Sequence, residues 1–200
     1  MNAGEKGYGP FLRLFAAVEL SDETRLAIAA EQKRIAARFS GKSMLRWVKP
    51  EQAHLTLVFL GNVDAARAPA VIESVGRDVD LPPFEMALDG LGVFPPRGAP
   101  RVLWVGVTDG AQETTLLQRV IARRVTSLGI AIEERSFHPH LTIARWRESR
   151  PADRDRALDT GSRGTLARVA VRAATLFESR LSPAGPAYTA LAHANLTRTP

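Results

Sequence analysis

A four-residue motif occurs twice in this chain, as His54-Leu55-Thr56-Leu57 and as His140-Leu141-Thr142-Ile143. Both copies fall in apolar runs typical of β-strands, where side chains two positions apart point to the same face. Each copy therefore projects an imidazole beside a hydroxyl. Because the chain has 4 histidines, two such contexts are roughly a one-in-a-thousand coincidence on composition alone. The repeat therefore indicates that these residues form a functional site.

The residue types in this repeat suit the cleavage of a phosphodiester. Imidazole titrates near pH 6.5, about the middle of the physiological range, so a pair can hold one acid and one base. The base takes a proton from water while the acid protonates the departing alkoxide oxygen. Threonine hydroxyls can donate hydrogen bonds to phosphoryl oxygens and stabilise the transition state. We therefore expect His54 and His140 to act as the acid–base pair, with Thr56 and Thr142 holding the phosphate.

Two alternatives use the same residues. In the first, the motif strands are buried and their histidines and threonines only make local hydrogen bonds, which the repetition disfavours. In the second, the histidines bind zinc, but neither His54 nor His140 has a carboxylate or a third imidazole at the usual ligand spacing. His138 and His140 could form a two-ligand clip, yet Pro139 lies between them and further ligands are missing. We expect no metal and no cofactor.

Composition narrows the class of protein. A hydrophobic content of 45% over 200 residues is enough for a substantial core. The net charge of +6 favours polyanionic partners. The chain has no cysteine, which excludes disulfides, a thiolate nucleophile and cysteine-ligated metal sites. The first residues lack the apolar stretch of a signal peptide, and no apolar run reaches the ~18 residues of a membrane helix. We expect a cytoplasmic protein that does not contact membranes.

The elements that must position the motifs follow from hydrophobic periodicity and turn residues. The pattern predicts helices at 21–39, 65–79 and 112–128, with Ser21 as an N-cap and Gly129 as a C-terminal stop. It predicts strands at 11–18, 45–48, 54–60, 84–88, 91–94 and 101–107, a strand at the second motif, and an antiparallel pair at 166–179 and 188–196. The first motif strand is expected to end at Gly61, and the polar stretch 147–164 to be a solvated connection with one short helix.

This order of elements predicts an α+β fold with largely antiparallel sheets. The repeated strand-then-helix pattern indicates two pseudo-symmetric lobes, each supplying one motif strand to a shared central groove, with the helices outside. Residues 1–10 are small and polar and are expected to form a flexible leader. Residues 11–200 are expected to form a single bilobal domain.

The residues around both motifs resemble the 2H phosphoesterase superfamily, and specifically the bacterial and archaeal RNA 2′,3′-cyclic phosphodiesterases, also called 2′-5′ RNA ligases. The resemblance runs from about Arg13 to the C-terminus. It rests on Arg13-Leu-Phe-Ala-Ala-Val18, Arg46-Trp-Val-Lys-Pro50, His54-Leu-Thr-Leu-Val-Phe-Leu-Gly61, Gly92-Val-Phe-Pro95, Arg101-Val-Leu-Trp104, Phe137-His-Pro-His-Leu-Thr-Ile-Ala-Arg145, Phe177-Glu-Ser179 and Gly185-Pro-Ala-Tyr188.

The resemblance implies a metal-free hydrolysis of terminal 2′,3′-cyclic phosphates on RNA to 2′-phosphates. By carry-over, His54 is the proton donor to the leaving 3′-oxygen and His140 is the base that activates water. Thr56, Thr142 and Arg145 would bind the phosphate. The expected partner is an RNA or oligonucleotide with a 2′,3′-cyclic phosphate end, and the protein is expected to be a monomer. The alternatives are a 2′-5′ RNA ligase that uses the same site and a noncatalytic RNA-binding module.

Other residues are candidates for contacts with RNA. Strict alternation puts Arg145 on the strand face opposite His140, so reaching the groove requires a bulge, a strand end or a long reach. Phe15, Trp47 and Trp104 could stack on a base or belong to the core. A modest basic cluster formed by Lys42, Arg46 and Lys49 could steer an RNA backbone or simply be a solvated loop.

Overall fold

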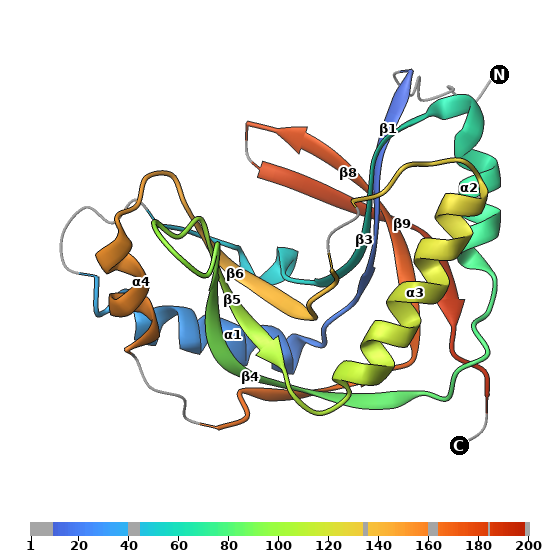
Figure 1. Ribbon diagram of the computed structural model, residues 1–200. Coiled ribbons are helices and arrows are strands. Elements are labelled where there is room, and N and C mark those ends of the chain that lie inside the picture. The colour runs from blue at the N-terminus through green and yellow to red at the C-terminus, as the bar shows by residue number, and fades with distance from the viewer. Residues whose placement is uncertain (1–9, 40–44, 134–135, 160–163, 184, 199–200) are drawn as a thin grey trace, which may run out of the picture.

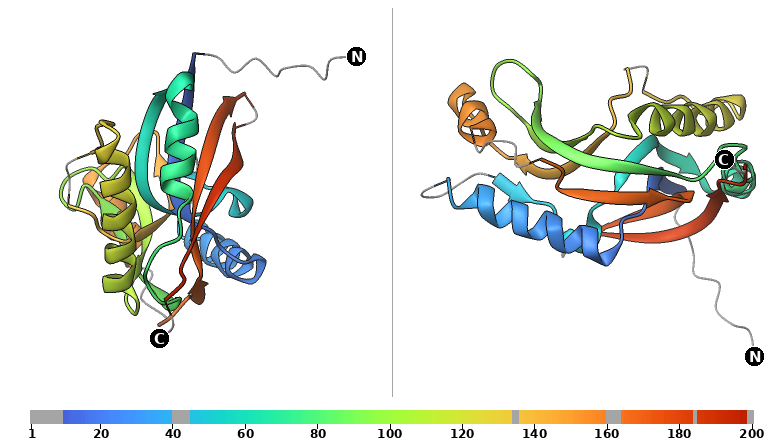
Figure 2. Two further views of the ribbon diagram at one scale, coloured as in Figure 1. Left: turned by 90° about the vertical axis from the view of Figure 1, so that its right-hand side faces the viewer. Right: turned by 90° about the horizontal axis from the view of Figure 1, so that it is seen from below.

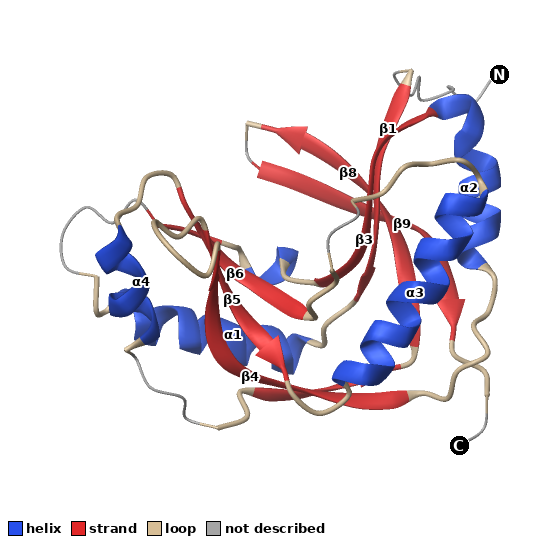
Figure 3. Ribbon diagram, in the orientation of Figure 1, coloured by secondary structure: helices blue, strands red, loops and turns tan. Residues whose placement is uncertain are grey.

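The computed structural model describes residues 10–39, 45–133, 136–159, 164–183 and 185–198. Its strands form two sheets in which the paired strands are antiparallel. The helices lie outside the sheets (Figure 3). This arrangement confirms the α+β fold with two lobes that the sequence predicts. The leader expected at residues 1–10 falls, except for Pro10, outside the described residues.

One lobe is built on a four-stranded sheet of order β3-β1-β8-β9. Its strands are β1 (Phe11–Val18), β3 (Leu55–Asp64), β8 (Ala173–Ser182) and β9 (Gly185–Asn195). Helices α2 (Ala68–Gly76) and α3 (Ala111–Ser127) pack against this sheet and lie beside each other (Figures 1 and 2). The first motif strand, β3, is at the edge of the sheet.

The other lobe is built on a five-stranded sheet of order β2-β6-β5-β4-β7. Its strands are β2 (Leu45–Trp47), β4 (Phe84–Phe94), β5 (Val102–Val107), β6 (His140–Trp146) and β7 (Ala167–Val171). Helices α1 (Asp22–Ala36) and α4 (Pro151–Leu158) belong to this lobe. Gln32 of α1 donates to the carbonyl oxygens of Val48 and Ile143, which fixes the helix against the second motif strand, β6.

The chain passes between the lobes several times. Strands β1 and β3 from the N-terminal part pair in one sheet with β8 and β9 from the end, while β2, β4 and β5 share the other sheet with β6 and β7. The single strand expected at 166–179 is in fact two, because the chain changes sheets at Arg172 between β7 and β8. Each sheet nevertheless contains one motif strand, as the repeat predicts.

Two strands run past the glycines at which the sequence pattern ends them. Strand β3 continues to Asp64, and β4 is continuous where two strands were expected. Gly61 and Gly90 adopt φ values of 69° and 72°, and the strand register shifts beside each of them. Glycine adopts positive φ without steric cost, so it accommodates a bulge and the strand bends instead of ending. The predicted strand ends were therefore wrong.

The helices begin and end close to the predicted positions. Ser21 caps α1 by accepting a hydrogen bond from the Thr24 backbone N–H, and Gly129, with φ of 69°, follows α3. The helix expected at 65–79 is divided into a short 3-10 helix, η2 (Ala65–Arg67), and α2, because Pro69 occupies the first turn of α2 and favours a new start there. None of the helices in the described ranges has the length and apolar character needed to cross a bilayer.

Candidate active site between the two motif strands

His54 stands immediately before β3, after the short helix η1 (Pro50–Gln52). Its Nδ1 lies 2.8 Å from the carbonyl oxygen of Gln52. The Gln52 side chain donates from Nε2 to the carbonyl oxygen of Pro186 at 2.6 Å, which ties this turn to β9. A carbonyl oxygen can only accept, so Nδ1 of His54 carries the hydrogen, and Nε2 of the neutral ring keeps a lone pair.

His140, the first residue of β6, is held in the same way. Its Nδ1 lies 2.7 Å from the carbonyl oxygen of His138, again two residues back in the chain. The ring therefore has the same tautomer as His54, with Nε2 free to exchange protons with a ligand. The two copies of the motif thus share their backbone anchor as well as their sequence.

Aromatic rings surround each imidazole. The ring centroid of His54 is 4.7 Å from that of Phe15 and 5.1 Å from that of Tyr188, to which it is perpendicular. The ring centroid of His140 is 5.0 Å from that of Phe94 and 6.0 Å from that of Trp104. Gly92 makes the second arrangement possible, because a Cβ at this position would overlap the Trp104 indole.

This packing lowers the pKa of both histidines below the usual 6.5. Burial is the largest cause at His54 and at His140, and the hydrogen bonds to the Gln52 and His138 carbonyls offset part of it. The positive charge of Arg145 lowers the pKa of both rings further, and His138 does the same for His140. Both imidazoles are therefore biased toward the neutral form.

A bulge in β6 brings Arg145 to the same side as the second motif. The pairing with β5 joins Trp104 to Thr142 but Leu103 to Ala144, so Ile143 is an extra residue. The alternation of side chains shifts by one position there. Strict alternation is wrong for Arg145 because of this bulge, and its side chain lies in the same groove as His140 and Thr142.

A bulge at the same place in β3 reorients the residues after the first motif. The pairing with β1 joins Ala17 to Thr56 but Ala16 to Val58, so Leu57 is the extra residue. Strict alternation along β3 would put Val58 on the same face as His54 and Thr56 and Phe59 on the opposite face, but the bulge reverses both positions. Val58 is 4% exposed and Phe59 is 46% exposed, so the phenyl ring faces the groove.

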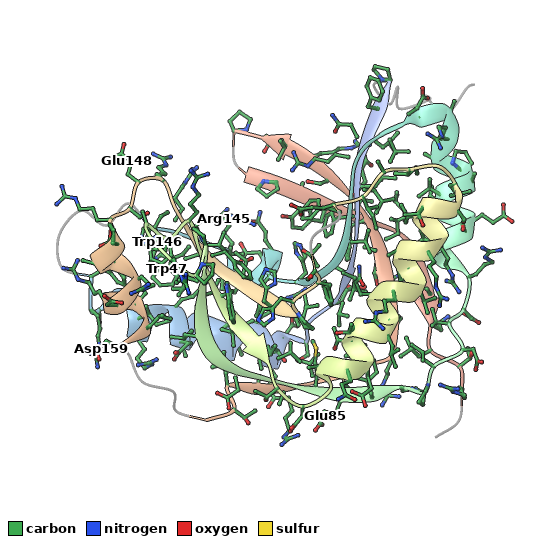
Figure 4. The ribbon with its side chains drawn as sticks, viewed as in Figure 1. Trp47, Glu85, Arg145, Trp146, Glu148 and Asp159 are labelled. Carbon is green, nitrogen blue, oxygen red and sulfur yellow. The ribbon has the colours of Figure 1, made fainter. Side chains whose placement is uncertain are left out.

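The groove between the lobes has a volume of about 1170 Å³, which is large enough for more than one nucleotide-sized group. Its lining includes Thr56, Phe59, His140, Thr142 and Arg145. The structure therefore brings together both threonines, one motif histidine and the arginine. Figure 4 shows Arg145 close to Trp47 and Trp146, at the end of β6.

His54 is not among the residues that line this groove. Its half-buried ring packs against those of Phe15 and Tyr188. Arg145 is close enough to lower the pKa of both His54 and His140, and it also lowers the pKa of Tyr188, although burial is the larger effect there and raises it. The guanidinium of Arg145 is thus the charge common to both motifs.

The remaining candidates from the sequence have other positions. His138 is exposed and lines the groove, whereas His193 bonds to Thr175 on the neighbouring strand. Phe15 is 1% exposed and belongs to the core, and Trp47 packs against the core. Trp104 lies under His138 and His140, at centroid distances of 5.0 and 6.0 Å.

Sequence reasoning missed Phe59 and Tyr188 as residues of the site. The signal for Phe59 was its spacing, since it follows His54 by five positions, as Arg145 follows His140. Tyr188 comes from β9, which is remote in sequence from both motifs, so only the fold reveals its contact with His54.

The described residues contain no group of three or more His, Cys, Asp or Glu side chains arranged to hold a metal ion. The groove instead offers imidazoles, hydroxyls and guanidinium groups. These groups include hydrogen-bond donors for phosphate oxygens, whereas the described lining has one carboxylate, that of Glu133, and magnesium or calcium prefers several oxygen ligands.

Comparisons with known proteins agree with the duplicated pattern. The sequence model of the LigT-like phosphoesterase family matches this chain twice, over residues 18–104 and 105–188. Each match contains one copy of the motif. The chain is also 35% identical over 179 residues to an RNA 2′,3′-cyclic phosphodiesterase from Archaeoglobus fulgidus, and the alignment covers 88% of this chain and 96% of the relative.

Solved structures share the fold. A protein from Thermus thermophilus superimposes with a TM-score of 0.76 at 30% identity, covering 93% of this chain and 98% of the other. LigT from E. coli, solved in complex with 3′-AMP, superimposes with a TM-score of 0.70 at 26% identity, covering 95% of this chain and 100% of the other.

Proposed function

The chain belongs to the LigT-like phosphoesterase family, and from this membership we propose that it hydrolyses the terminal 2′,3′-cyclic phosphate of RNA to a 2′-phosphate. In this proposal His140 is the base and His54 is the acid. Residues 11–200 act as one bilobal unit, because each sheet takes strands from both halves of the chain.

The proposed reaction is a hydrolysis with balanced proton transfers. Nε2 of His140 takes a proton from water while the water oxygen attacks phosphorus. The bond between phosphorus and the 3′-oxygen breaks, and protonated His54 gives the Nε2 proton to that oxygen. The products are a 2′-phosphate and a free 3′-hydroxyl, and the two imidazoles return to their starting states by exchanging protons with solvent.

The charge of the substrate supports this division of roles. Burial disfavours the protonated form of His54 in the free protein, but a bound phosphate places a negative charge nearby and raises the pKa of the ring. Substrate binding therefore promotes the protonated acid that the reaction needs. His140 is already biased toward the neutral form that a base requires.

Thr56, Thr142 and Arg145 are the proposed phosphate ligands. Each hydroxyl can donate one hydrogen bond to a phosphoryl oxygen, and the guanidinium can donate two in a fork. All three side chains line the same groove. In the transition state, where negative charge accumulates on these oxygens, such donors stabilise most strongly.

One observation carries the proposal: both motif histidines are anchored through Nδ1 to a backbone carbonyl two residues back, and Arg145 acts electrostatically on both. Two rings with the same free nitrogen, both within the electrostatic reach of one cation, suit an acid–base pair at a phosphate. Purely structural histidines would not need this correspondence.

The test is to incubate the purified protein with RNA that carries a 2′,3′-cyclic phosphate, in EDTA, with an RNA bearing a 5′-hydroxyl as an acceptor for ligation. Mass spectrometry should show the addition of one water, and ³¹P NMR should place the phosphate on the 2′-oxygen. Joining of the two RNAs would indicate the ligase, and binding without turnover the noncatalytic module. Loss of activity in EDTA would contradict the metal-independent reaction.

A further inference from the structure

Four arginines at one end of the groove have no ion pair with a carboxylate among the described residues. Arg101, Arg145 and Arg147 line the groove, and Arg46 is exposed on β2 beside them. Seven other arginines of the described ranges are paired with acids, namely Arg25, Arg34, Arg154, Arg156, Arg168, Arg180 and Arg198. What distinguishes the four is therefore their shared position beside the groove. We call these four arginines the arginine track.

Two members of the arginine track lie directly opposite each other. In the antiparallel pairing of β2 with β6, Arg46 is the partner of Arg145. Partners in an antiparallel pair have Cβ atoms roughly 5 Å apart on the same face, and like charges at such positions destabilise the sheet. This repulsion lies next to the candidate active site, and consecutive phosphates of a bound RNA, one at each guanidinium group, would offset it.

The other two members are held on the same rim by the backbone. The Trp146 backbone N–H donates to the carbonyl of Arg101 at 2.9 Å, which fixes Arg101 beside the end of β6. Arg147 follows directly after this strand, and the Ser149 hydroxyl bonds to the carbonyl of Pro100. The arginine track therefore continues from Arg145 away from the motif residues, along the end of the five-stranded sheet.

The groove carries few acidic groups to neutralise these charges. Among the described residues that line it, Glu133 supplies one carboxylate against the three guanidinium groups of Arg101, Arg145 and Arg147. A groove with this excess of positive charge attracts phosphates, and it has more cationic groups than one bound phosphate needs.

We propose that the arginine track binds the phosphodiester immediately upstream of the terminal cyclic phosphate, so that the preferred substrate is an oligoribonucleotide and not a cyclic mononucleotide. This inference rests on the proposed function for the position of the terminal phosphate. Arg145 contacts that phosphate, and Arg46, Arg101 and Arg147 contact the next one. Guanidinium groups suit this task because they donate paired hydrogen bonds to phosphate oxygens and keep their charge at all physiological pH values.

The experiment compares adenosine 2′,3′-cyclic phosphate with a hexaribonucleotide that ends in the same cyclic phosphate. For the unmodified protein, kcat/KM should be roughly tenfold or more higher for the hexamer, because only the hexamer offers charged hydrogen bonds to the outer arginines. Arg46→Gln and Arg147→Gln should each reduce kcat/KM for the hexamer by roughly 5- to 20-fold. Neither substitution should change kcat/KM for the mononucleotide.

Matched variants separate a phosphate contact from a loss of overall charge. Arg172→Gln removes the same charge at the opposite edge of the five-stranded sheet, after β7. It should change kcat/KM for neither substrate. Arg46→Gln should reduce the slope of log affinity against log salt concentration by about 0.7. Arg46→Lys retains the charge and should keep the slope of the unmodified protein.

A direct measurement of RNA binding tests the inference independently of enzymatic activity. Fluorescence anisotropy with an RNA hexamer ending in a 3′-phosphate measures affinity without turnover. Weaker binding by Arg46→Gln and Arg147→Gln, but not by Arg172→Gln, supports the arginine track. Equal kcat/KM for the two substrates, or unchanged hexamer binding by both variants, overturns it. Failure to turn over either substrate would instead contradict the proposed function.

Discussion

Phe59 and Arg145 occupy the same position in the two copies of the motif. Each follows its histidine by five residues and stands after a bulge in its strand, and each side chain faces the groove. Phe59 pairs with Phe15 of β1, as Arg145 pairs with Val102 of β5. The duplicated backbone is thus symmetric, whereas the side chain at this equivalent position is an aromatic ring in β3 and a guanidinium in β6.

This asymmetry predicts that Phe59 contacts a base. An exposed aromatic face binds unpaired bases without sequence preference, at about 1–3 kcal/mol per base. Phe59→Ala should therefore raise KM for an RNA substrate by roughly 10-fold, with a smaller effect on kcat. Steady-state kinetics with the RNA substrate measures both constants. Phe11→Ala, which truncates another exposed phenylalanine of the same sheet, should leave KM unchanged. An equal effect of both variants would exclude a specific contact by Phe59.

The second prediction concerns the motif histidines. His54→Ala and His140→Ala should each reduce kcat by roughly 10²- to 10⁴-fold, because each removes one of the two proton transfers. His193→Ala is the matched control, since His193 is exposed and bonds to Thr175 away from the motif strands. Near-normal turnover by either motif variant would contradict the acid–base assignment. Circular dichroism should show that all three variants are folded.

A substrate with a good leaving group distinguishes the acid from the base. A phosphodiester of p-nitrophenol needs little protonation of the departing oxygen, so His54→Ala should recover most of its lost rate on this substrate. His140→Ala should remain impaired, because water still has to lose a proton. Recovery by His140→Ala instead would reverse the two roles.

The sequence was sufficient to predict the main features of the fold and to identify Thr56, Thr142 and Arg145, which the groove brings together with His140. Helices α1 and α3 appear close to their expected bounds because Ser21 and Gly129 give local signals for where they begin and end. The motif strands were also recognisable, since alternation identified Thr56 and Thr142 on the faces that line the groove.

What the sequence could not supply depends on long-range pairing. The bulges at Leu57 and Ile143 are determined by the registers of β3 with β1 and of β6 with β5, and no local pattern marks them. For that reason strict alternation gives the wrong direction for Phe59, and the direction of Arg145 required the structure. The change of sheet at Arg172 is likewise a property of the whole fold, because β7 and β8 read as one apolar run.

The pH dependence of catalysis follows from the direction of the histidine pKa shifts. Burial lowers the pKa of His54 and of His140 below 6.5. One ring must be protonated and the other neutral, so both limbs of the kcat/KM profile, which reports the free enzyme, move to lower pH. We expect the optimum of kcat/KM below pH 6.5. The optimum of kcat should lie at higher pH, because bound phosphate raises both pKa values.

Arg145→Gln tests the electrostatic part of this argument. Removing the positive charge that lowers both pKa values should shift the optimum of kcat/KM to higher pH, in addition to weakening substrate binding. A pH series of kcat/KM for the variant and the unmodified protein measures the shift. Arg172→Gln should leave the optimum where it is. An optimum that does not move in Arg145→Gln would show that its charge does not act on the two rings.

The pairing of Arg46 with Arg145 predicts that binding and stability respond to mutation in opposite directions. Because like charges opposite each other destabilise an antiparallel pair, Arg46→Gln should raise the free energy of unfolding by roughly 0.2–1 kcal/mol. Urea denaturation at low salt measures this gain, and added salt should reduce it by screening the repulsion. Arg172→Gln, which has no such opposite partner among the described strand pairs, should give no comparable gain. If Arg46→Gln destabilises the protein, then Arg46 contributes to the fold, and a loss of RNA binding in that variant would have to be attributed to structure and not to a missing phosphate contact.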